Sequence, residues 1–374
     1  MRGFAGWLGS GLLVLVMPMR LAAQDDATRA RARFDSALVA EVTALARQRA
    51  AADSFSGVVL LARGDRQLLL LPLGYRDRER RLPNEGSTKF AIASMTKMFT
   101  GVAVGQLVQR GRLRFTDTVR MLAPALPSSL AGRLTVHQLL THTSGLGSIW
   151  GDEFRRRGGD SFHAPRDFYP LFVNQPLQFE PGARWGYSNA GYVVLGDLIE
   201  RVSGEGYADY IRRHVFLPAG MSTALDDEVS REDPDRAIPY SRQLSDSRGL
   251  ERADRVGLRR MMPAGGAVAS APDLWRFARA LTGHRLLNGA YTDTATTGKV
   301  TYRRGASYAH GFANEMVNGQ VVIFHDGGAE GISGNLDIFP ATGHVAIELS
   351  NYDHPAVGPI RDLMRARITR RASE

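Results

Sequence analysis

The organisation of this chain follows from one ten-residue segment, Phe90-Ala91-Ile92-Ala93-Ser94-Met95-Thr96-Lys97-Met98-Phe99. It places a hydroxyl and an amine three residues apart at the start of an apolar run with helical character. Residues i and i+3 lie on one face of a helix, so Ser94 Oγ and Lys97 Nζ can touch. The start of a helix also carries unsatisfied N–H groups and a partial positive charge, which favour an oxyanion and an ionised nucleophile. An acyl-transfer serine requires this combination.

Lys97 is notable because the chain uses arginine for almost all of its positive charge. Lys89, Lys97 and Lys299 are the only lysines. Arginine keeps its proton in proteins, whereas the pKa of a lysine falls readily on burial or beside another cation. A lysine three residues after a serine therefore indicates a proton acceptor. The alternative is a surface charge, because the tetrapeptide Ser-x-x-Lys is frequent by chance.

Composition excludes several classes of function. The 374 residues are 44% hydrophobic and 23% charged, which is ordinary for a globular protein and sufficient for one large domain or two lobes. The formal net charge of +9 comes from scattered arginines, without the aromatic-interleaved basic block of a nucleic-acid-binding surface. Cysteine is absent and no histidine cluster has metal-ligand spacing, so we expect no disulfide, metal or cofactor. We interpret His137 and His142 as packing or capping residues.

Residues 1–23 have the pattern of a secretory signal peptide. Arg2 supplies the positive charge, an apolar run extends from Phe4 to Met17, and Leu21-Ala22-Ala23 offers a small-residue cleavage site. The apolar run is too short for a comfortable membrane span. We predict an exported bacterial protein, periplasmic or secreted, whose mature chain begins at about residue 24 and has no transmembrane domain. An uncleaved anchor is the alternative.

Hydrophobic patterns predict strands near both ends of the mature chain and helices between them. The fold that we expect is α/β (α+β), with one antiparallel sheet flanked by helices and an inserted helical lobe. The sheet lobe comprises about residues 24–111 and 290–374, and the helical lobe about residues 112–289. In the first part of the chain we predict a helix over 25–52, a hairpin over 56–71, a helix buried on all sides over 94–111 and a loop over 150–170. In the second part we predict a helix over 271–281, strands over 308–317, 320–325, 334–339 and 344–349, and a helix over 360–368.

Two further segments carry chemistry. Trp185-Gly186-Tyr187-Ser188-Asn189 places a phenol and an amide two residues apart before an apolar helix. A tyrosine near a lysine can ionise more easily, and an amide NH₂ group can hold a substrate carbonyl. His325-Asp326-Gly327-Gly328 ends a predicted strand, where glycines let a substrate approach backbone N–H groups. A buried structural tyrosine and a strand-end turn residue are the alternatives for Tyr187 and His325.

Together the three segments resemble the motifs of the serine β-lactamase and penicillin-binding-protein superfamily, which are Ser-x-x-Lys, Tyr-x-Asn and Lys/His-x-Gly. The matching residues are Ser94 to Lys97, Tyr187 to Asn189 and His325 to Gly327, in the family's order. The flanking segments Leu139 to Leu146 and Phe179 to Gly182 are similar to the class C branch and its esterase, D-aminopeptidase and DD-carboxypeptidase relatives. The resemblance covers most of the mature chain and implies a cleft between a sheet lobe and a helical lobe.

The resemblance also implies a role for each motif residue. Ser94 would attack the carbonyl and form an acyl-enzyme. Lys97 and Tyr187 would share the general acid and base work, in an order that stays open. Asn189 would orient the substrate, and the N–H groups of Ser94 and Gly328, beside Gly327, would form the oxyanion hole. His325 would tune the electrostatics near Tyr187 or hold a substrate carboxylate.

The histidine of the third motif shifts the expected substrate. Class C β-lactamases typically have a lysine followed by threonine there, so the loss of a permanent charge favours an esterase or peptidase-like hydrolase over a true β-lactamase. Its substrate would be a small ester, amide or peptide, for example one derived from the cell wall. A non-hydrolytic penicillin-binding sensor needs the same acylating residues and remains an alternative. The chain has no Gly-x-Ser-x-Gly segment, which argues against an α/β-hydrolase.

Overall fold

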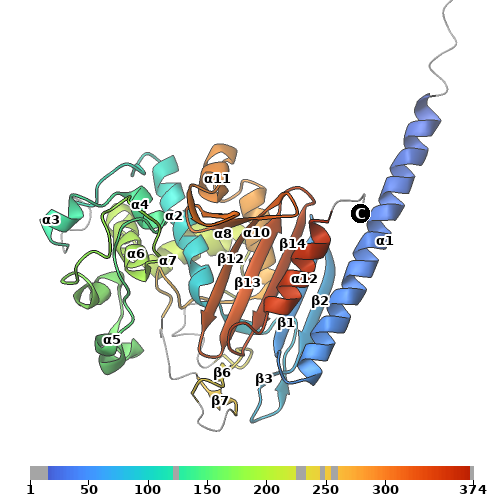
Figure 1. Ribbon diagram of the computed structural model, residues 1–374, viewed down its shortest axis with the longest axis horizontal. Coiled ribbons are helices and arrows are strands. Elements are labelled where there is room, and N and C mark those ends of the chain that lie inside the picture. The colour runs from blue at the N-terminus through green and yellow to red at the C-terminus, as the bar shows by residue number, and fades with distance from the viewer. Residues whose placement is uncertain (1–15, 121–125, 225–232, 245–248, 254–259, 371–374) are drawn as a thin grey trace, which may run out of the picture.

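The computed structural model describes residues 16–120, 126–224, 233–244, 249–253 and 260–370. At its centre is an eight-stranded antiparallel sheet (Figure 1). Strands from both ends of the chain are neighbours in this sheet, because β1 pairs with β14 from Gly57↔Ser350 to Arg63↔His344. This confirms the expected α+β fold. In spatial order the strands are β2 (Arg66–Leu73), β1 (Gly57–Arg63), β14 (His344–Ser350), β13 (Ile332–Phe339), β12 (Gln320–Ala329), β11 (Ala313–Val317), β10 (Ala306–Tyr308) and β9 (Val300–Arg303).

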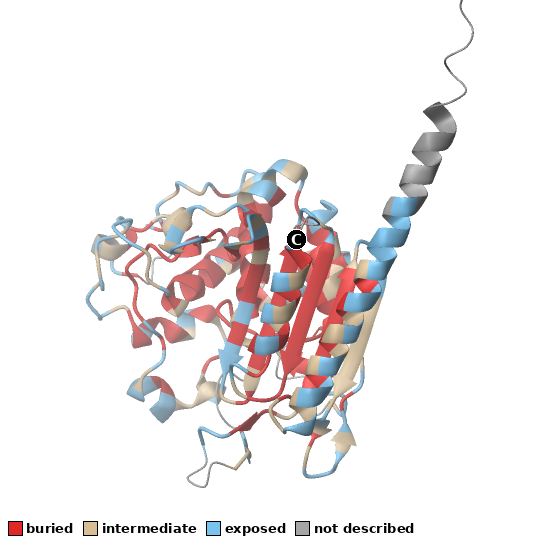
Figure 2. Cartoon of the chain, turned by 45° about the vertical axis from the view of Figure 1, so that its right-hand side comes forward, coloured by how far each residue is buried: buried red, intermediate tan, exposed pale blue. Residues whose placement is uncertain are grey.

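Two helices from opposite ends of the chain cover one face of the sheet. They are α1 (Val16–Ala51) and α12 (Gly358–Ile368), and they contact each other. Leu38, Val42, Ile360 and Met364 are buried against the strands, and the outer sides of both helices are exposed (Figure 2). Residues 1–15 of the expected signal peptide lie outside the described residues. No helix of the described ranges is both long enough and apolar enough to cross a membrane.

The helical lobe lies beside the sheet, on the far side from α1 (Figure 1). Between it and the sheet runs α2 (Thr96–Gln109), in which every residue from Thr96 to Leu107 is buried, as expected for a helix that packs on all sides. The lobe is built from α3 (Ser128–Ala131), α4 (Val136–Leu140), α5 (Asp152–Arg157), η2 (Gly159–Ser161), η3 (Pro165–Leu171), α6 (Asn189–Ser203), α7 (Tyr207–Ile211), the π-helical turn η4 (Arg212–Phe216) and α8 (Leu217–Ala219).

Three short strand pairs and two more helices complete the described elements. The pairs are β3 (Tyr75–Asp77) with β4 (Leu82–Pro83), β5 (Lys89–Ala91) with β8 (Val268–Ser270), and β6 (Tyr240–Ser241) with β7 (Glu251–Arg252). The helices are α10 (Ala271–Thr282) and α11 (Gly289–Thr296). Because α10 packs against β1 and β14, residues 271–282 lie with the sheet, although we expected the helical lobe to extend to residue 289.

Three segments differ from their expected secondary structure. Residues 150–170 contain α5, η2 and η3 rather than a loop, because Phe154, Phe162 and Phe168 stack on one another and anchor these short turns. The expected strand over 308–317 is divided into β10 and β11. The break falls at Gly311, which has a left-handed φ of 89° and packs closely against the carbonyl oxygen of Lys97. The strand that contains His325 continues to Ala329.

Two carboxyl groups in the sheet, those of Asp337 and Glu348, are fully buried. Glu348, on β14, lies beneath α12, and its Oε2 accepts a hydrogen bond from Asn335 Nδ2 at 3.1 Å. Burial, with the neighbouring Asp337 carboxylate, raises the pKa of Glu348 to about 8. A carboxyl whose pKa is higher in the folded than in the unfolded state stabilises the fold while it stays protonated. That contribution is complete below the ordinary pKa of glutamate and is lost as the pH rises through about 8.

Glu348→Gln should therefore abolish a pH-dependent loss of stability. Above pH 8 we expect the variant to melt several degrees higher than the wild type, because the amide never ionises, and we expect the difference to shrink toward pH 5. Thermal unfolding followed by circular dichroism from pH 5 to pH 9 measures this. The matched change at exposed Glu153 should leave the pH profile unaltered. A melting-temperature difference that is constant over this range would contradict the assignment of the buried charge to Glu348.

Candidate active site

Ser94 stands at a sharp turn between a strand and a helix. The chain leaves β5, passes through the 3₁₀ turn η1 (Ala93–Met95) and enters α2 at Thr96. Ala93 adopts a left-handed φ of 44°, which is unfavourable for a residue with a side chain. The fully buried side chain of Met95 fixes the turn from below. The turn therefore presents Ser94 Oγ at the surface of the cleft, directly before the first residues of α2.

Lys97 is fully buried one helical turn beyond the serine. Its Nζ lies 3.2 Å from Ser94 Oγ, 2.8 Å from Asn189 Oδ1 and 2.7 Å from the backbone oxygen of Ala264. Burial lowers the pKa of Lys97 well below its usual value, although the Asp326 carboxylate opposes this change. A neutral amine has two N–H donors and one lone pair. The two carbonyl oxygens take the donors, which leaves the lone pair for the Ser94 hydroxyl.

Tyr187 approaches the serine from the helical lobe. Its OH lies 2.9 Å from Ser94 Oγ and donates to it. The ring is 40% exposed at the cleft, but the surroundings of the hydroxyl are poorly solvated, and this raises the pKa of Tyr187 in spite of the hydrogen bond to Ser94. The expectation that this phenol ionises more easily is therefore wrong for the resting site, because burial of the hydroxyl and the nearby Asp326 carboxylate both disfavour a phenolate. Tyr187 is a proton donor at rest.

Asn189 begins α6, and Ser188 caps the helix by accepting a hydrogen bond from Gly191 N–H at 3.0 Å. This cap fixes the direction in which the Asn189 side chain leaves the helix. Its Oδ1 accepts from Lys97, so its NH₂ group is directed at the cavity that both Asn189 and Ser94 line. To hold a substrate carbonyl, the Asn189 amide has to turn its NH₂ group toward the substrate. The hydrogen bond from Lys97 to Asn189 Oδ1 favours this orientation.

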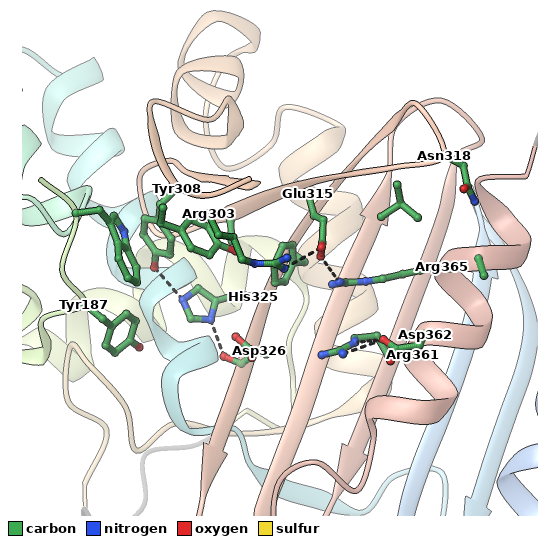
Figure 3. A pocket seen from close by; sticks show the side chains of 16 residues that line it. Tyr187, Arg303, Tyr308, Glu315, Asn318, His325, Asp326, Arg361, Asp362 and Arg365 are labelled. Carbon is green, nitrogen blue, oxygen red and sulfur yellow. Dashed lines mark hydrogen bonds and ion pairs between the residues drawn. The ribbon is translucent and has the colours of Figure 1, made fainter. Parts of the chain in front are cut away.

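His325 lies beside the site but does not open onto it. The ring is 3% exposed. Its Nδ1 donates to the backbone oxygen of Asp326 at 2.6 Å, and its Nε2 accepts from Tyr308 OH at 2.9 Å (Figure 3). Burial lowers the pKa of His325 to about 4. A neutral, enclosed imidazole cannot act as a cation for a substrate carboxylate, so of the two expected roles only the electrostatic one fits.

The two glycines of the third motif bring β12 against the serine turn. A Cβ atom on Gly327 would lie 2.1 Å from the carbonyl oxygen of Ile92, so only glycine allows β12 to lie this close to η1. Gly328 follows on the exposed side and lines the same cavity as Ser94. This is the position in which its N–H group is expected to serve an oxyanion.

Sequence reasoning missed three contributors to the site. The Ala264 carbonyl has no side-chain signature. Tyr308 was placed only as a strand residue, although its hydroxyl hydrogen-bonds to His325 Nε2 at 2.9 Å. His142, interpreted as a packing or capping residue, does both: its ring centroid lies 4.4 Å from that of Tyr187, and its Nδ1 accepts from Ser188 N–H at 3.1 Å. The one sequence feature that could have pointed to this role is the position of His142 between two threonines near a helix end.

A cavity of about 460 Å³ opens in front of Ser94 and Asn189. One wall is apolar and is formed by Trp150, Phe154 and Ile332. Arg155 also lines this cavity, but its guanidinium is largely exposed and pairs with Asp152. The cavity therefore suits an uncharged, partly apolar acyl group.

The fold and this arrangement of serine, lysine and tyrosine define a serine hydrolase superfamily, and comparison with known proteins agrees. The family model described as Beta-lactamase matches residues 42–370. The chain belongs to this family.

Named relatives extend the comparison. Penicillin-binding protein 4* of Bacillus subtilis (strain 168) is 32% identical over 298 residues, which are 75% of this chain and 64% of that protein. The chain thus spans less than two thirds of this relative's length. A penicillin-binding protein from Bacillus halodurans has a crystal structure with a TM-score of 0.77 and 28% identity, covering 85% of this chain and 97% of that one. A D-stereospecific amidohydrolase from Streptomyces sp. shares the fold at a TM-score of 0.73 and 24% identity, covering 87% and 98%.

Lys97→Arg should be nearly as damaging as Lys97→Ala, because the site needs a lone pair and not a charge. We expect both variants to lose at least about a hundredfold in kcat/KM for a nitrophenyl ester, the usual scale for removing a general base. Lys299→Arg, at an exposed lysine, is the matched control and should keep full activity. An arginine variant at position 97 with near-normal activity would rule out proton acceptance by this residue.

Proposed function

We propose that this protein is a serine hydrolase that forms an acyl-enzyme on Ser94 and hydrolyses small esters or amides, including peptides of D-amino acids. One observation carries the proposal: Ser94 Oγ lies within hydrogen-bond distance of both a buried amine, Lys97 Nζ at 3.2 Å, and a phenol, Tyr187 OH at 2.9 Å. The serine thus has a proton acceptor on one side and a proton donor on the other before substrate arrives.

Acylation follows from this division of roles. Neutral Lys97 takes the proton of the Ser94 hydroxyl as Oγ attacks the substrate carbonyl carbon. The developing oxyanion accepts hydrogen bonds from the N–H groups of Ser94 and Gly328, and the amide of Asn189 holds the acyl part of the substrate. Tyr187 passes its proton to the leaving group as the scissile bond breaks, and the protonated lysine can restore it.

Deacylation reverses the direction of proton transfer. A water molecule takes the place of the leaving group beside Tyr187 and attacks the ester carbonyl, and Ser94 recovers its proton as it leaves. Among the described residues, no carboxylate or imidazole hydrogen-bonds to Ser94 Oγ, whose partners are the Lys97 amine and the Tyr187 phenol. Tyr187 and Lys97 therefore have to activate this water as well.

The neutrality of His325 favours an esterase or peptidase activity over β-lactam hydrolysis, because no permanent positive charge stands at the third motif to hold a carboxylate. A β-lactamase, and a sensor that is acylated without turnover, share the same nucleophile and are the alternative outcomes. We further propose that the protein is exported, which rests on the signal-like pattern of residues 1–23.

Ser94→Ala tests the nucleophile. We expect ester hydrolysis to fall by about a thousandfold or more, as when the nucleophile of a serine hydrolase is removed. The melting temperature should change little, because the Ser94 side chain is only half-buried. Hydrolysis of a nitrophenyl ester and thermal unfolding, measured side by side, check both expectations. Activity retained above a few per cent would refute the assignment.

Turnover separates the hydrolase from the sensor. Stopped-flow measurement of nitrophenol release should show an early release stoichiometric with enzyme, followed by a steady rate. An early release without a following steady rate would identify a sensor. Rates with a chromogenic cephalosporin and with D-amino-acid peptides, measured on the same preparation, then rank the substrate classes.

A further inference from the structure

Asp326 occupies a position in the third motif that the mechanism above does not use. Successive residues of a strand point to opposite faces. His325 and Gly327 therefore face the interior, toward Tyr308 and η1, whereas Asp326 faces outward and is exposed. In the view of Figure 3 its side chain lies between the hydroxyl of Tyr187 and Arg361. A carboxylate thus stands at the mouth of the site, next to the general acid.

The charges around Asp326 leave it uncompensated. It lines a cavity of about 680 Å³ that begins at Tyr187 and extends along the sheet toward α12. Each arginine that lines this cavity is paired with another carboxylate: Arg303 with Glu315, Arg361 with Asp362, and Arg365 with Asp337 and Glu315. Within the described part of the chain, no cationic group makes an ion pair with Asp326. The negative charge of Asp326 is therefore available to a ligand.

The cavities assign Asp326 to the leaving-group side of the scissile bond. The 460 Å³ cavity contains Ser94, Tyr187 and Asn189 and accepts the acyl part. Asp326 is absent from its lining. It lines, together with Tyr187, both the 680 Å³ cavity and a 440 Å³ space that also includes Ser94, and Asn189 lines neither. The leaving group has to lie beside its proton donor, Tyr187, on the side away from Asn189, so it lies beside Asp326.

We propose that Asp326 is a specificity-determining residue that selects leaving groups with a positively charged amine and disfavours leaving groups with a carboxylate near the scissile bond. The inference rests on the proposed function and names its substrate class: esters or amides of cationic alcohols or amines. The negative charge of Asp326 disfavours the carboxylate next to the scissile bond of a carboxypeptidase substrate.

The measurement has to separate recognition from catalysis, because the charge of Asp326 also acts on the catalytic groups. It favours the charged form of Lys97, and it raises the pKa of Tyr187 together with burial. Neutralising it therefore changes the rate for every substrate. The ratio of kcat/KM between substrates that share an acyl group cancels this common effect and reports the leaving group alone.

Three acetyl thioesters of similar size provide that ratio: acetylthiocholine, which is cationic, its neutral isostere S-(3,3-dimethylbutyl) thioacetate, and S-acetyl-3-mercaptopropionate, which is anionic. In each reaction Ser94 Oγ bonds to the acetyl carbon, the C–S bond breaks, the thiol leaves with a proton, and water releases acetate. The wild type should favour the cationic over the neutral ester on the order of tenfold, the scale of one charge pair in a partly screened site. High salt should reduce this preference.

Asp326→Asn is the decisive variant, and Asp65→Asn, at an exposed hairpin residue, removes one negative charge elsewhere as the control. We expect Asp326→Asn to reduce the cationic-to-neutral ratio about tenfold and to improve the anionic ester relative to the neutral one, with Asp65→Asn unchanged. Ser94-dependent hydrolysis with equal ratios in wild type and Asp326→Asn would overturn the inference alone. Absence of Ser94-dependent hydrolysis of all three thioesters, and of nitrophenyl esters, would overturn the proposed function and the inference with it.

Discussion

The structure depends on one buried amine. Lys97 has no carboxylate partner among the described residues, and its hydrogen-bond partners are the Asn189 amide oxygen, the Ala264 carbonyl and Ser94. An unpaired ammonium in such a place is costly, so burial lowers the pKa of Lys97 and favours the neutral amine, which is a base. The two carbonyls that take its N–H groups come from α6 and from the turn before β8. The helical lobe and the sheet lobe are thus both fixed to the same nitrogen atom.

The two histidines nearest to this lysine, His142 and His325, are also held in their neutral forms. His142 is fully buried between Tyr187 and Tyr308, and burial holds its pKa well below the usual value. His325 is neutral for the same reason. The catalytic groups therefore exchange protons in surroundings where no resident charge competes with the charge that develops on the substrate. The exception is the exposed carboxylate of Asp326, at the rim rather than at the centre.

Sequence patterns predicted the sheet, the all-round burial of α2, and the proximity of Ser94 and Lys97, because these follow from periodicity and from helix geometry. They did not predict that the Tyr187 hydroxyl keeps its proton, because the pKa of Tyr187 depends on the desolvation that the assembled lobes impose. They did not predict that His325 is enclosed, because the phase of a strand relative to its neighbours is set by tertiary packing. The contact between Lys97 and the Ala264 carbonyl could not be predicted, because every residue has a backbone oxygen and the residue type does not indicate which one accepts a hydrogen bond from a side chain.

The pairing of β1 with β14 has a consequence for folding during synthesis. Gly57 and Ser350, which are partners in the sheet, are separated by most of the polypeptide. A chain emerging from the ribosome cannot pair β1 with β14 until β14 has been synthesised. Folds dominated by such distant contacts also form slowly, because loop-closure entropy must be overcome first. The sheet lobe therefore completes its strand pairing only after the whole helical lobe has been synthesised.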